Sequence, residues 1–355
     1  MLYFAFAFRC SPVPLDYPGD RLALVDFFLA TGGSSQWQIN TYWLSANVSL
    51  CDWYGVGCTI FNVSNPNANQ TQIVRVSDLR LRENNLVGTF PESFGSLTML
   101  TSIDLVINQL FGPLPPSIGS LVRLQYLDLW RNRIAGPLPE TMGNLSRIEY
   151  LSMNSNALTG PLPTSLGNAN QMVTLDLARN RLSGELPPSM AALRNLTTLD
   201  LATNRFSGTL PSWLGHLTQL RGLWLANCNF SGSIPSSLGD LISLAGLAID
   251  GNYLVSGTIP PSLGNLINLT SIHIKHTAVF GTIPASFSNL VNMGELYLSN
   301  NSLHGSLPNL ERLKKLRVLN VTSNGGLSGI LPEWLNGTTF SQMTLLDVSG
   351  NQISG

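Results

Sequence analysis

The sequence of 355 residues has few charged side chains and no excess of either sign. Asp, Glu, Lys and Arg make up 11% of it, and 19 basic against 20 acidic side chains leave a formal net charge of -1. A soluble domain carries about 25% charged residues, and proteins that bind nucleic acid or anionic membrane surfaces carry a basic patch. The charge balance therefore argues against both of these partners.

Long apolar runs are also missing, although hydrophobic residues make up 44% of the chain and the mean hydropathy is +0.16. A membrane-spanning helix needs about 18 to 20 consecutive apolar residues, so we expect no membrane insertion within this span. Intrinsic disorder requires low hydrophobicity and high net charge, which this chain does not have. What the chain has in number is glycine, with 32 residues, and proline, with 21.

The glycines and prolines recur with a fixed period. The pattern G-x-[LIF]-P returns every 24 residues in its first six steps, and L-x-x-L-x-L-x-x-N-x-L precedes it, most clearly from Leu124 to Ile134 and from Leu196 to Phe206. The glycines of the pattern are Gly88, Gly112, Gly136, Gly160, Gly184, Gly208, Gly232, Gly257, Gly281, Gly305 and Gly329, and Gly355 opens one more copy. This period and string are the signature of leucine-rich repeats. We predict about twelve repeats over residues 76–355, the last incomplete.

The repeat predicts an α/β solenoid, a right-handed superhelix with a concave parallel β-sheet and a convex side of 3-10 turns and loops. The leucines of each L-x-L point inward from a short strand, and the residues between them face outward. An asparagine follows each strand, where its buried amide can bond backbone groups of neighbouring coils. This column contains Asn84, Asn108, Asn132, Asn156, Asn180, Asn204, Asn252, Asn301, Asn324 and Asn351, with Cys228 and Thr277 in the remaining two coils. Cysteine is an accepted alternative there, which favours a buried structural thiol at Cys228.

Residues 20–75 are predicted to cover the first coil, because the ends of a solenoid need a cap. An amphipathic helix is expected from Asp20 to Ala30. Its apolar side contains Leu22, Val25, Phe28 and Leu29. Trp37, Trp43 and the string C-D-W-Y-G-V-G-C, from Cys51 to Cys58, follow the helix.

The motif C-x-W-x-G-V-x-C after a short helix resembles the amino-terminal cap of plant-type extracellular leucine-rich-repeat proteins, and the L-x-G-x-[IL]-P repeat is similar to theirs. The resemblance covers the chain from about residue 20 onward. It implies a disulfide between Cys51 and Cys58, and the role of a receptor ectodomain or of a secreted inhibitor of wall-degrading enzymes, such as a polygalacturonase inhibitor. A zinc site is disfavoured, because this spacing without a second Cys/His pair does not supply four ligands.

The two ends of the sequence leave questions about processing and length. Residues 1–19 are either a truncated signal peptide or a misplaced start, because the apolar stretch from Met1 to Cys10 lacks a basic n-region and is short. The chain stops inside a repeat at Gly355 with no capping segment, so we expect a fragment of a longer protein. In the resembled family a cap, a membrane anchor, or a transmembrane helix with a kinase domain follows at this point.

Ten N-x-[ST] sequons are present, and each is a potential glycosylation site. We predict glycans at Asn47, Asn62, Asn69, Asn144, Asn195, Asn229, Asn268 and Asn336. Asn300 and Asn320 are left out because they would point from the strand face, where a glycan would obstruct binding. Glycans would help to keep a weakly charged chain soluble. Together with the cap disulfide, they favour an extracellular or cell-surface location, secreted or membrane-anchored.

Enzymatic motifs are scarce. No G-x-x-x-x-G-K-[ST] loop, G-x-S-x-G elbow or H-E-x-x-H helix occurs. His273, Lys275 and His276 share one coil with Glu295 on the next, so metal or acid-base chemistry is an alternative to the favoured interpretation as a solvated polar patch. The aspartate column of Asp104, Asp128, Asp176 and Asp200 is assigned to the repeat consensus. We predict no enzymatic activity, no cofactor and no metal.

Recognition is better supported, because the variable strand positions project from the concave sheet and carry Trp, Tyr and Arg, which are enriched at binding hot spots. The predicted ligand-binding residues are Tyr126, Trp130, Arg131, Tyr150, Asn154, Arg179, Trp224, His273, Lys275 and Tyr297, with the first five as the favoured site. The expected function is a non-enzymatic extracellular module that binds a protein, peptide or glycan. The alternatives are a structural or adhesive surface glycoprotein and a secreted enzyme inhibitor.

Overall fold

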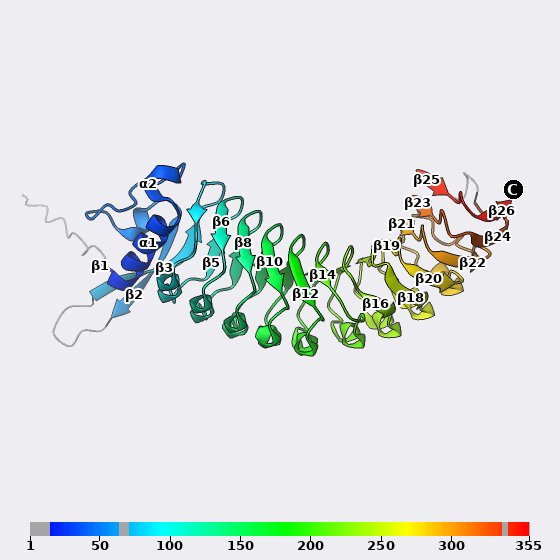
Figure 1. The fold of residues 1–355 in the computed structure, drawn as a ribbon, viewed down its shortest axis with the longest axis horizontal. Coiled ribbons are helices and arrows are strands. Elements are labelled where there is room, and N and C mark those ends of the chain that lie inside the picture. Colours follow the sequence, from blue (N-terminus) through cyan, green and yellow to red (C-terminus); the bar gives the residue numbers. More distant parts are fainter. Residues whose placement is uncertain (1–14, 64–70, 336–339, 355) are drawn as a thin grey trace, which may run out of the picture.

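The computed structural model describes residues 15–63, 71–335 and 340–354, so the apolar stretch from Met1 to Cys10 and Gly355 lie outside the described residues. The described residues form an elongated arc of stacked coils (Figure 1). Short 3-10 helices line the convex edge of this arc, and a helical cap covers the amino-terminal end. The predicted leucine-rich-repeat solenoid is confirmed.

One long sheet runs through the coils. Its strands are β1 (Leu15–Asp16), β2 (Val56–Val63), β3 (Thr71–Arg80), β5 (Ser102–Asp104), β7 (Tyr126–Asp128), β9 (Tyr150–Ser152), β11 (Thr174–Asp176), β13 (Thr198–Asp200), β15 (Gly222–Trp224), β17 (Gly246–Ala248), β19 (Ser271–His273), β21 (Glu295–Tyr297), β23 (Val318–Asn320) and β25 (Leu345–Asp347). They follow this order and pair in parallel, except that β2 pairs antiparallel with β3 alone. Equivalent residues of successive coils are in register, as where Leu127 pairs with Ile103 and with Leu151. The predicted concave parallel sheet is therefore present.

Two further sheets lie where each coil leaves the main sheet, and the sequence patterns did not predict them. One contains β4 (Val87–Gly88), β6 (Gln109–Gly112), β8 (Arg133–Gly136), β10 (Ala157–Gly160), β12 (Arg181–Gly184) and β14 (Arg205–Phe206), and the other contains β16 (Ser231–Ser233), β18 (Leu254–Thr258), β20 (Ala278–Gly281), β22 (Ser302–Gly305), β24 (Gly326–Ile330) and β26 (Gln352–Ser354). These strands end at or near the repeat glycine. Gly112 has a φ of 74°, a conformation that side chains disfavour.

The convex edge carries one 3-10 helix in most coils. These helices are η2 (Glu92–Ser96), η3 (Pro116–Ser120), η4 (Glu140–Asn144), η5 (Thr164–Asn168), η6 (Pro188–Ala192), η7 (Ser212–His216), η8 (Ser236–Asp240), η9 (Pro261–Asn265) and η10 (Ala285–Asn289). The repeat proline directly precedes each helix, as Pro91 precedes η2 with a φ of -75°. A fixed φ at this position directs the chain into the helix. The segment from Gly305 to Leu316 is one residue shorter than in the regular coils and forms turns instead.

The asparagine column joins the coils through the core. Nδ2 of Asn132 donates to the carbonyl of Leu105 in the preceding coil at 3.0 Å and to the carbonyl of Leu129 in its own coil at 3.1 Å. Its Oδ1 accepts the N–H of Leu110 at 3.0 Å. The same three-way pattern recurs at Asn108, Asn156, Asn180, Asn204, Asn252, Asn301 and Asn324. The backbone groups between coils are thereby paired without water, as the sequence predicted.

Cys228 takes the asparagine position in one coil. Its side chain is buried, and Sγ lies 3.5 Å from the carbonyl oxygen of Leu201. Burial raises the pKa of the Cys228 thiol to about 11, so the thiol stays protonated at neutral pH. A protonated, buried thiol is a poor nucleophile, which agrees with the structural role expected from the sequence.

The amino-terminal cap contains α1 (Pro18–Ala30), α2 (Gly33–Gln36) and η1 (Leu50–Asp52). The expected helix is present, and its predicted apolar side is confirmed for Phe28, which is buried, but wrong for Leu22 and Leu29, which are 67% and 63% exposed. The residues that face the first coils are Asp20, Ala23, Leu24, Phe27 and Phe28, and Val25 packs at the edge of the core. Hydrophobic spacing could not reveal that an aspartate sets the rotation of this helix.

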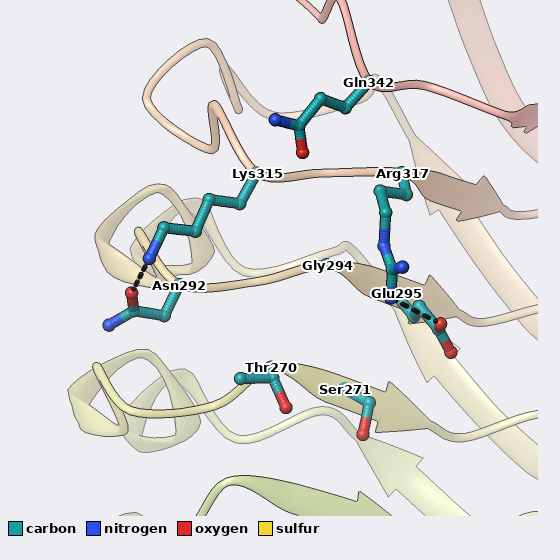
Figure 2. A pocket seen from close by; sticks show the side chains of 8 residues that line it. All are labelled: Thr270, Ser271, Asn292, Gly294, Glu295, Lys315, Arg317 and Gln342. Carbon is teal, nitrogen blue, oxygen red and sulfur yellow. Dashed lines mark hydrogen bonds and ion pairs between the residues drawn. The ribbon is translucent and has the colours of Figure 1, made fainter.

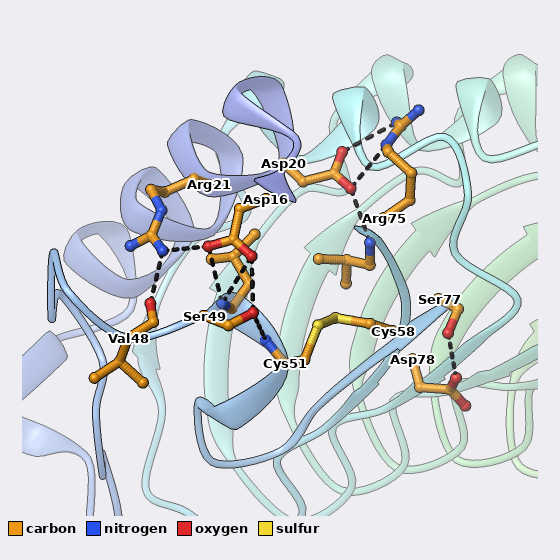
Figure 3. Close-up of a disulfide and its surroundings, with 12 residues drawn as sticks. Asp16, Asp20, Arg21, Val48, Ser49, Cys51, Cys58, Arg75, Ser77 and Asp78 are labelled. Carbon is orange, nitrogen blue, oxygen red and sulfur yellow. Dashed lines mark hydrogen bonds and ion pairs between the residues drawn. A yellow bond between two sulfur atoms is a disulfide. The ribbon is translucent and has the colours of Figure 1, made fainter. Parts of the chain in front are cut away.

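Asp20 is fully buried and anchors the helix on the first coil. Its carboxylate accepts two N–H groups of Arg75, at 2.9 and 3.0 Å, and the backbone N–H of Val76 at 2.8 Å (Figure 3). A buried carboxylate is stable only when it is paired and hydrogen-bonded, so these three bonds hold the amino-terminal end of α1 against β3.

The predicted disulfide joins Cys51, in η1, to Cys58, in β2 (Figure 3). Next to it, Asp16 accepts the hydroxyl of Ser49 at 2.8 Å and the N–H of Leu50 at 3.1 Å. A chain of aromatic contacts lies in the core of the cap and contains Phe27, Phe28, Trp37, Trp43, Trp53, Phe90 and Phe94. This cluster covers the leucines of the first coil.

Replacing Asn180 by alanine should lower the free energy of unfolding by about 2 kcal/mol, because it leaves the N–H of Leu158 unpaired in the core and removes one of the two amide donors to the carbonyls of Met153 and Leu177. Urea denaturation followed by circular dichroism measures the change. The control is Asn170→Ala, an exposed asparagine in the same region of the chain. Equal effects of the two substitutions would contradict the role of the column.

Candidate ligand-binding surface

All ten predicted ligand-binding residues lie in the strands of the main sheet or in the residues that directly follow these strands. The structure brings them into two groups, with Arg179 and Trp224 between. The first cluster contains Tyr126, Trp130, Arg131, Tyr150 and Asn154. The second cluster contains His273, Lys275 and Tyr297.

The first cluster is built on two stacked tyrosines. Tyr126 and Tyr150 are paired in register on β7 and β9, and their rings stack at a centroid distance of 4.6 Å and an angle of 10°. The hydroxyl of Tyr126 donates to Oδ2 of Asp128 at 3.1 Å. The pKa of Tyr126 is raised far above its ordinary value, and burial is the largest cause, followed by the carboxylate of Asp128. The phenol is therefore a neutral, oriented group at neutral pH.

Trp130, Arg131 and Asn154 complete the first cluster just beyond the strands. The guanidinium of Arg131 lies 5.5 Å from the ring centroid of Trp130, within the range of a cation–π contact. Nδ2 of Asn154 donates to Oδ2 of Asp176 at 3.1 Å. The residue directly before each column asparagine has a left-handed backbone conformation, with a φ of 53° at Arg131 and 55° at Arg179. Both arginines therefore lie in a sharp turn at the edge of the sheet.

The aspartate column lies at the carboxyl ends of its strands, where each side chain bonds the turn that follows. Oδ1 of Asp128, Asp176 and Asp200 accepts the backbone N–H two residues later, at 3.0, 3.1 and 3.0 Å. Burial raises the pKa of all three carboxyls, and that of Asp200 to about 6. The same structural bond recurs in the coils that carry an aspartate at this position, in agreement with the assignment of these residues to the consensus. Asp176 and Asp200 also leave two half-buried acids on the concave surface.

Trp224 lies flat on the sheet in the middle of the concave surface. A Cβ atom at Gly246 would lie 2.1 Å from Cη2 of Trp224, so the indole occupies the space above this glycine in the next strand. Ala178, Ala202 and Ala248 occupy neighbouring outward positions. Between the two clusters the concave sheet therefore carries a strip of small side chains that project little from its surface. This strip, which we call the low strip, was not predicted from the sequence.

The second cluster combines aromatic and charged groups. The rings of His273 and Tyr297 meet edge to face at 4.7 Å, and Nζ of Lys275 lies 5.3 Å from the Tyr297 centroid. Nε2 of His273 is 3.8 Å from a carboxylate oxygen of Glu295. Burial is the largest effect on His273 and lowers its pKa, so the ring is neutral at pH 7. His276 is exposed in the turn after the strand.

Neither cluster has the donor set of a metal site. Within residues 15–63, 71–335 and 340–354, no group of three or more His, Cys, Asp or Glu side chains is arranged to hold a metal ion.

A polar hollow of about 430 Å³, which we call the flank pocket, lies beside the second cluster on the side where the strands begin (Figure 2). Its lining contains Thr270, Ser271, Asn292, Gly294, Glu295, Lys315, Arg317 and Gln342. The pocket was not predicted, because its lining residues lie away from the outward strand positions that carry the predicted ligand-binding residues. The available signal was Gly294, which stands where other coils carry a side chain.

The predicted glycosylation sites in the described part of the chain are all exposed. They are Asn47, Asn62, Asn144, Asn195, Asn229 and Asn268. Asn69 and Asn336 lie outside the described residues. Glycosylation stays a prediction from the sequence.

Comparison with known proteins identifies the repeats and their structural relatives. A leucine-rich-repeat-region model matches residues 142–253, and a single leucine-rich-repeat model matches residues 123–145. No curated protein matches the chain.

Three solved plant receptor structures are similar to the chain. The Arabidopsis receptor kinase HAESA ectodomain, in complex with an N-terminally extended IDA peptide hormone, is 32% identical with a TM-score of 0.79, over 94% of this chain and 53% of that one. The plant peptide hormone receptor RGFR1, in complex with RGF2, is 32% identical with a TM-score of 0.71, over 78% and 48%. PEPR1 with AtPEP1 is 28% identical with a TM-score of 0.66, over 96% and 52%.

The chain is a leucine-rich-repeat protein, and its relatives include plant receptor ectodomains. It spans about half the length of these receptor chains. Among the helices that the structure describes, none combines the length and apolar character needed to cross a bilayer.

Raising the pH from 4 to 7 should weaken the fold through Asp200. Its folded pKa of about 6 exceeds the ordinary 3.8, so the folded chain holds the proton more tightly and loses this stability as the pH rises through 6. Asp200→Asn keeps the acceptor for Ala202 and should increase the free energy of unfolding at pH 7.5 by about 1 kcal/mol, allowing for partial exposure. The gain should vanish near pH 4.

Urea denaturation at several pH values measures this difference, with Asp240→Asn on the convex edge as the exposed control. A gain that is the same at pH 4 and pH 7.5 would show that desolvation of the Asp200 carboxylate is not its cause.

Proposed function

We propose that the chain is an extracellular, non-enzymatic recognition module that binds a peptide or protein segment along the concave sheet. The observation that carries the proposal is the pair of aromatic clusters on either side of a low strip of small side chains. The solved relatives named above are in complex with peptide hormones, and another HAESA structure also contains the co-receptor SERK1. A glycan has no comparable support, so the proposal is limited to polypeptide ligands.

The spacing of the two clusters suits a short extended peptide. Seven strand-to-strand steps separate β7 from β21, and parallel strands lie about 4.8 Å apart, which gives about 34 Å. An extended chain covers this distance with about ten residues, at about 3.3 Å per residue. A ligand of this length could reach both clusters at once.

The aromatic side chains are arranged for binding before a ligand arrives. Tyr126 and Tyr150 stack on each other and His273 packs against Tyr297, so their rotamers are already restricted. A pre-ordered side chain loses less conformational entropy on binding. Large, rigid aromatic anchors are typical of binding hot spots.

The charges between the clusters favour a ligand with a cationic group. Asp176 and Asp200 line the strip, and Arg179 stands at its edge. Oδ1 of both aspartates accepts the turn N–H, and Oδ2 of Asp176 also accepts Nδ2 of Asn154. A carboxylate oxygen has two lone pairs, so both acids can still accept from a ligand. We therefore expect the preferred peptides to place a lysine, an arginine or a free amino terminus over this strip.

The extracellular location is supported by the relatives, which are receptor ectodomains, and by the Cys51–Cys58 disulfide. Disulfides persist in oxidising compartments.

Peptides of ten to twelve residues selected from a display library on the wild-type chain should bind at least tenfold more weakly to Trp130→Ala and to Tyr297→Ala, because truncating a hot-spot aromatic costs about 2 kcal/mol. Calorimetry of the purified variants measures the affinities. The matched control is Tyr253→Ala, an aromatic side chain that is 72% exposed beside β18, outside the main sheet.

Selected peptides that bind equally well to all three variants would exclude the concave surface as the site. The adhesive glycoprotein or a secreted inhibitor that uses another surface would then become the better hypothesis.

A further inference from the structure

We infer that the flank pocket is a second binding site, separate from the concave clusters, that takes a carboxylate side chain of a polypeptide partner. Figure 2 shows Lys315 and Arg317 reaching over a hollow with Gly294 at its centre and Thr270 and Ser271 on the opposite side. These residues come from three successive coils. The inference does not depend on the function proposed for the concave surface.

The pocket exists because one position in the repeat has no side chain. The residue directly before each main-sheet strand is Thr101, Gln125, Glu149, Val173, Thr197, Arg221, Ala245, Thr270, Gly294, Arg317 or Thr344 from β5 to β25. Gly294 is the only glycine in this column. The gap that it leaves between Thr270 and Arg317 forms the middle of the hollow.

The two cations of the pocket retain unused donors. Nζ of Lys315 donates to Oδ1 of Asn292 at 2.7 Å, and Nη2 of Arg317 donates to Oε1 of Glu295 at 3.1 Å. An ammonium has three N–H donors and a guanidinium has five. Both groups can therefore bind an incoming oxyanion while they keep these bonds.

The charge of the pocket is positive in a chain that is nearly neutral. Lys315 and Arg317 face one acidic lining residue, Glu295, which leaves one net positive charge. The chain has only three lysines, and all of them lie between residues 275 and 315. Arg312 and Lys314 are exposed on the turn that leads to the pocket. Clustered cations attract anionic groups over several ångströms.

A carboxylate carried on a polypeptide fits this pocket better than a free inorganic anion. The backbone N–H groups of Gly294 and Arg317 donate to carbonyls of the preceding coils, each at 2.8 Å. They are unavailable to enclose a small anion as a backbone nest would. Two side-chain cations on an open surface bind an isolated ion weakly, so the affinity must come from neighbouring contacts of a longer ligand.

The test uses fluorescein-labelled hexaglutamate as the probe, with binding measured by fluorescence anisotropy on the full chain at low ionic strength. Gly294→Thr fills the hollow and leaves every charge in place. Lys315→Gln combined with Arg317→Gln removes the charges and leaves the hollow open. We expect each change to weaken binding of the probe at least tenfold.

Gly294→Thr should fold normally. A Cβ atom at this position would lie no closer than 3.4 Å to the nearest atom, the carbonyl oxygen of Thr270, and threonine occupies the same position in four other coils. Thermal denaturation confirms folding of each variant. A further variant, Glu295→Gln, releases Arg317 and should tighten binding several-fold, a gain that general loss of structure could not produce.

The matched control is Arg147→Gln, an exposed cation at the position of Lys315 in an earlier coil, and it should leave binding unchanged. Equal binding by all variants, or an equal loss in the Arg147 control, would overturn the inference. Inorganic sulfate that competes as strongly as the peptide would reassign the pocket to a free ion. Trp130→Ala should not affect the probe, so this inference and the concave-surface proposal can fail separately.

Discussion

The structure depends on hydrogen bonds to the backbone N–H and C=O groups that lie between coils, because these groups are buried in the core away from water. Asn132 and seven other column asparagines each join two coils with three hydrogen bonds inside the core. Unpaired backbone groups there would each cost about 1 to 3 kcal/mol. This constraint holds successive coils in one register, and the register places equivalent residues of neighbouring strands side by side. The same constraint limits sequence variation to the outward positions.

The outward positions therefore decide what the solenoid can bind. Tyr126 stacks on Tyr150 because the two residues occupy the same position in adjacent coils. His273 meets Tyr297 for the same reason. A regular scaffold can in this way assemble a binding surface from single residues that are 24 positions apart in the sequence. The flank pocket arises by the opposite means, because one coil lacks the side chain that its neighbours carry.

Features encoded by the repeat period or by a family motif could be predicted, and features that depend on packing between elements could not. The solenoid, the concave sheet and the asparagine column follow from the period, and the Cys51–Cys58 disulfide from a family resemblance. The side of α1 that packs on the first coil was predicted wrongly at Leu22 and Leu29, because hydrophobic spacing does not reveal that Asp20 is buried with Arg75. The side sheets were missed because their strands are short, end at or near the repeat glycine and have no apolar alternation of their own.

The repeat period is enough to specify the architecture, since a repeat of fixed length can bury its leucines only by stacking on copies of itself. It also determined which side chains project from the concave sheet. How those side chains meet follows from the packing of the coils, as in the stacked tyrosines, the indole over Gly246, and the two cations around Gly294. These contacts join different coils, and their distances depend on the size and charge of neighbours that no single repeat contains.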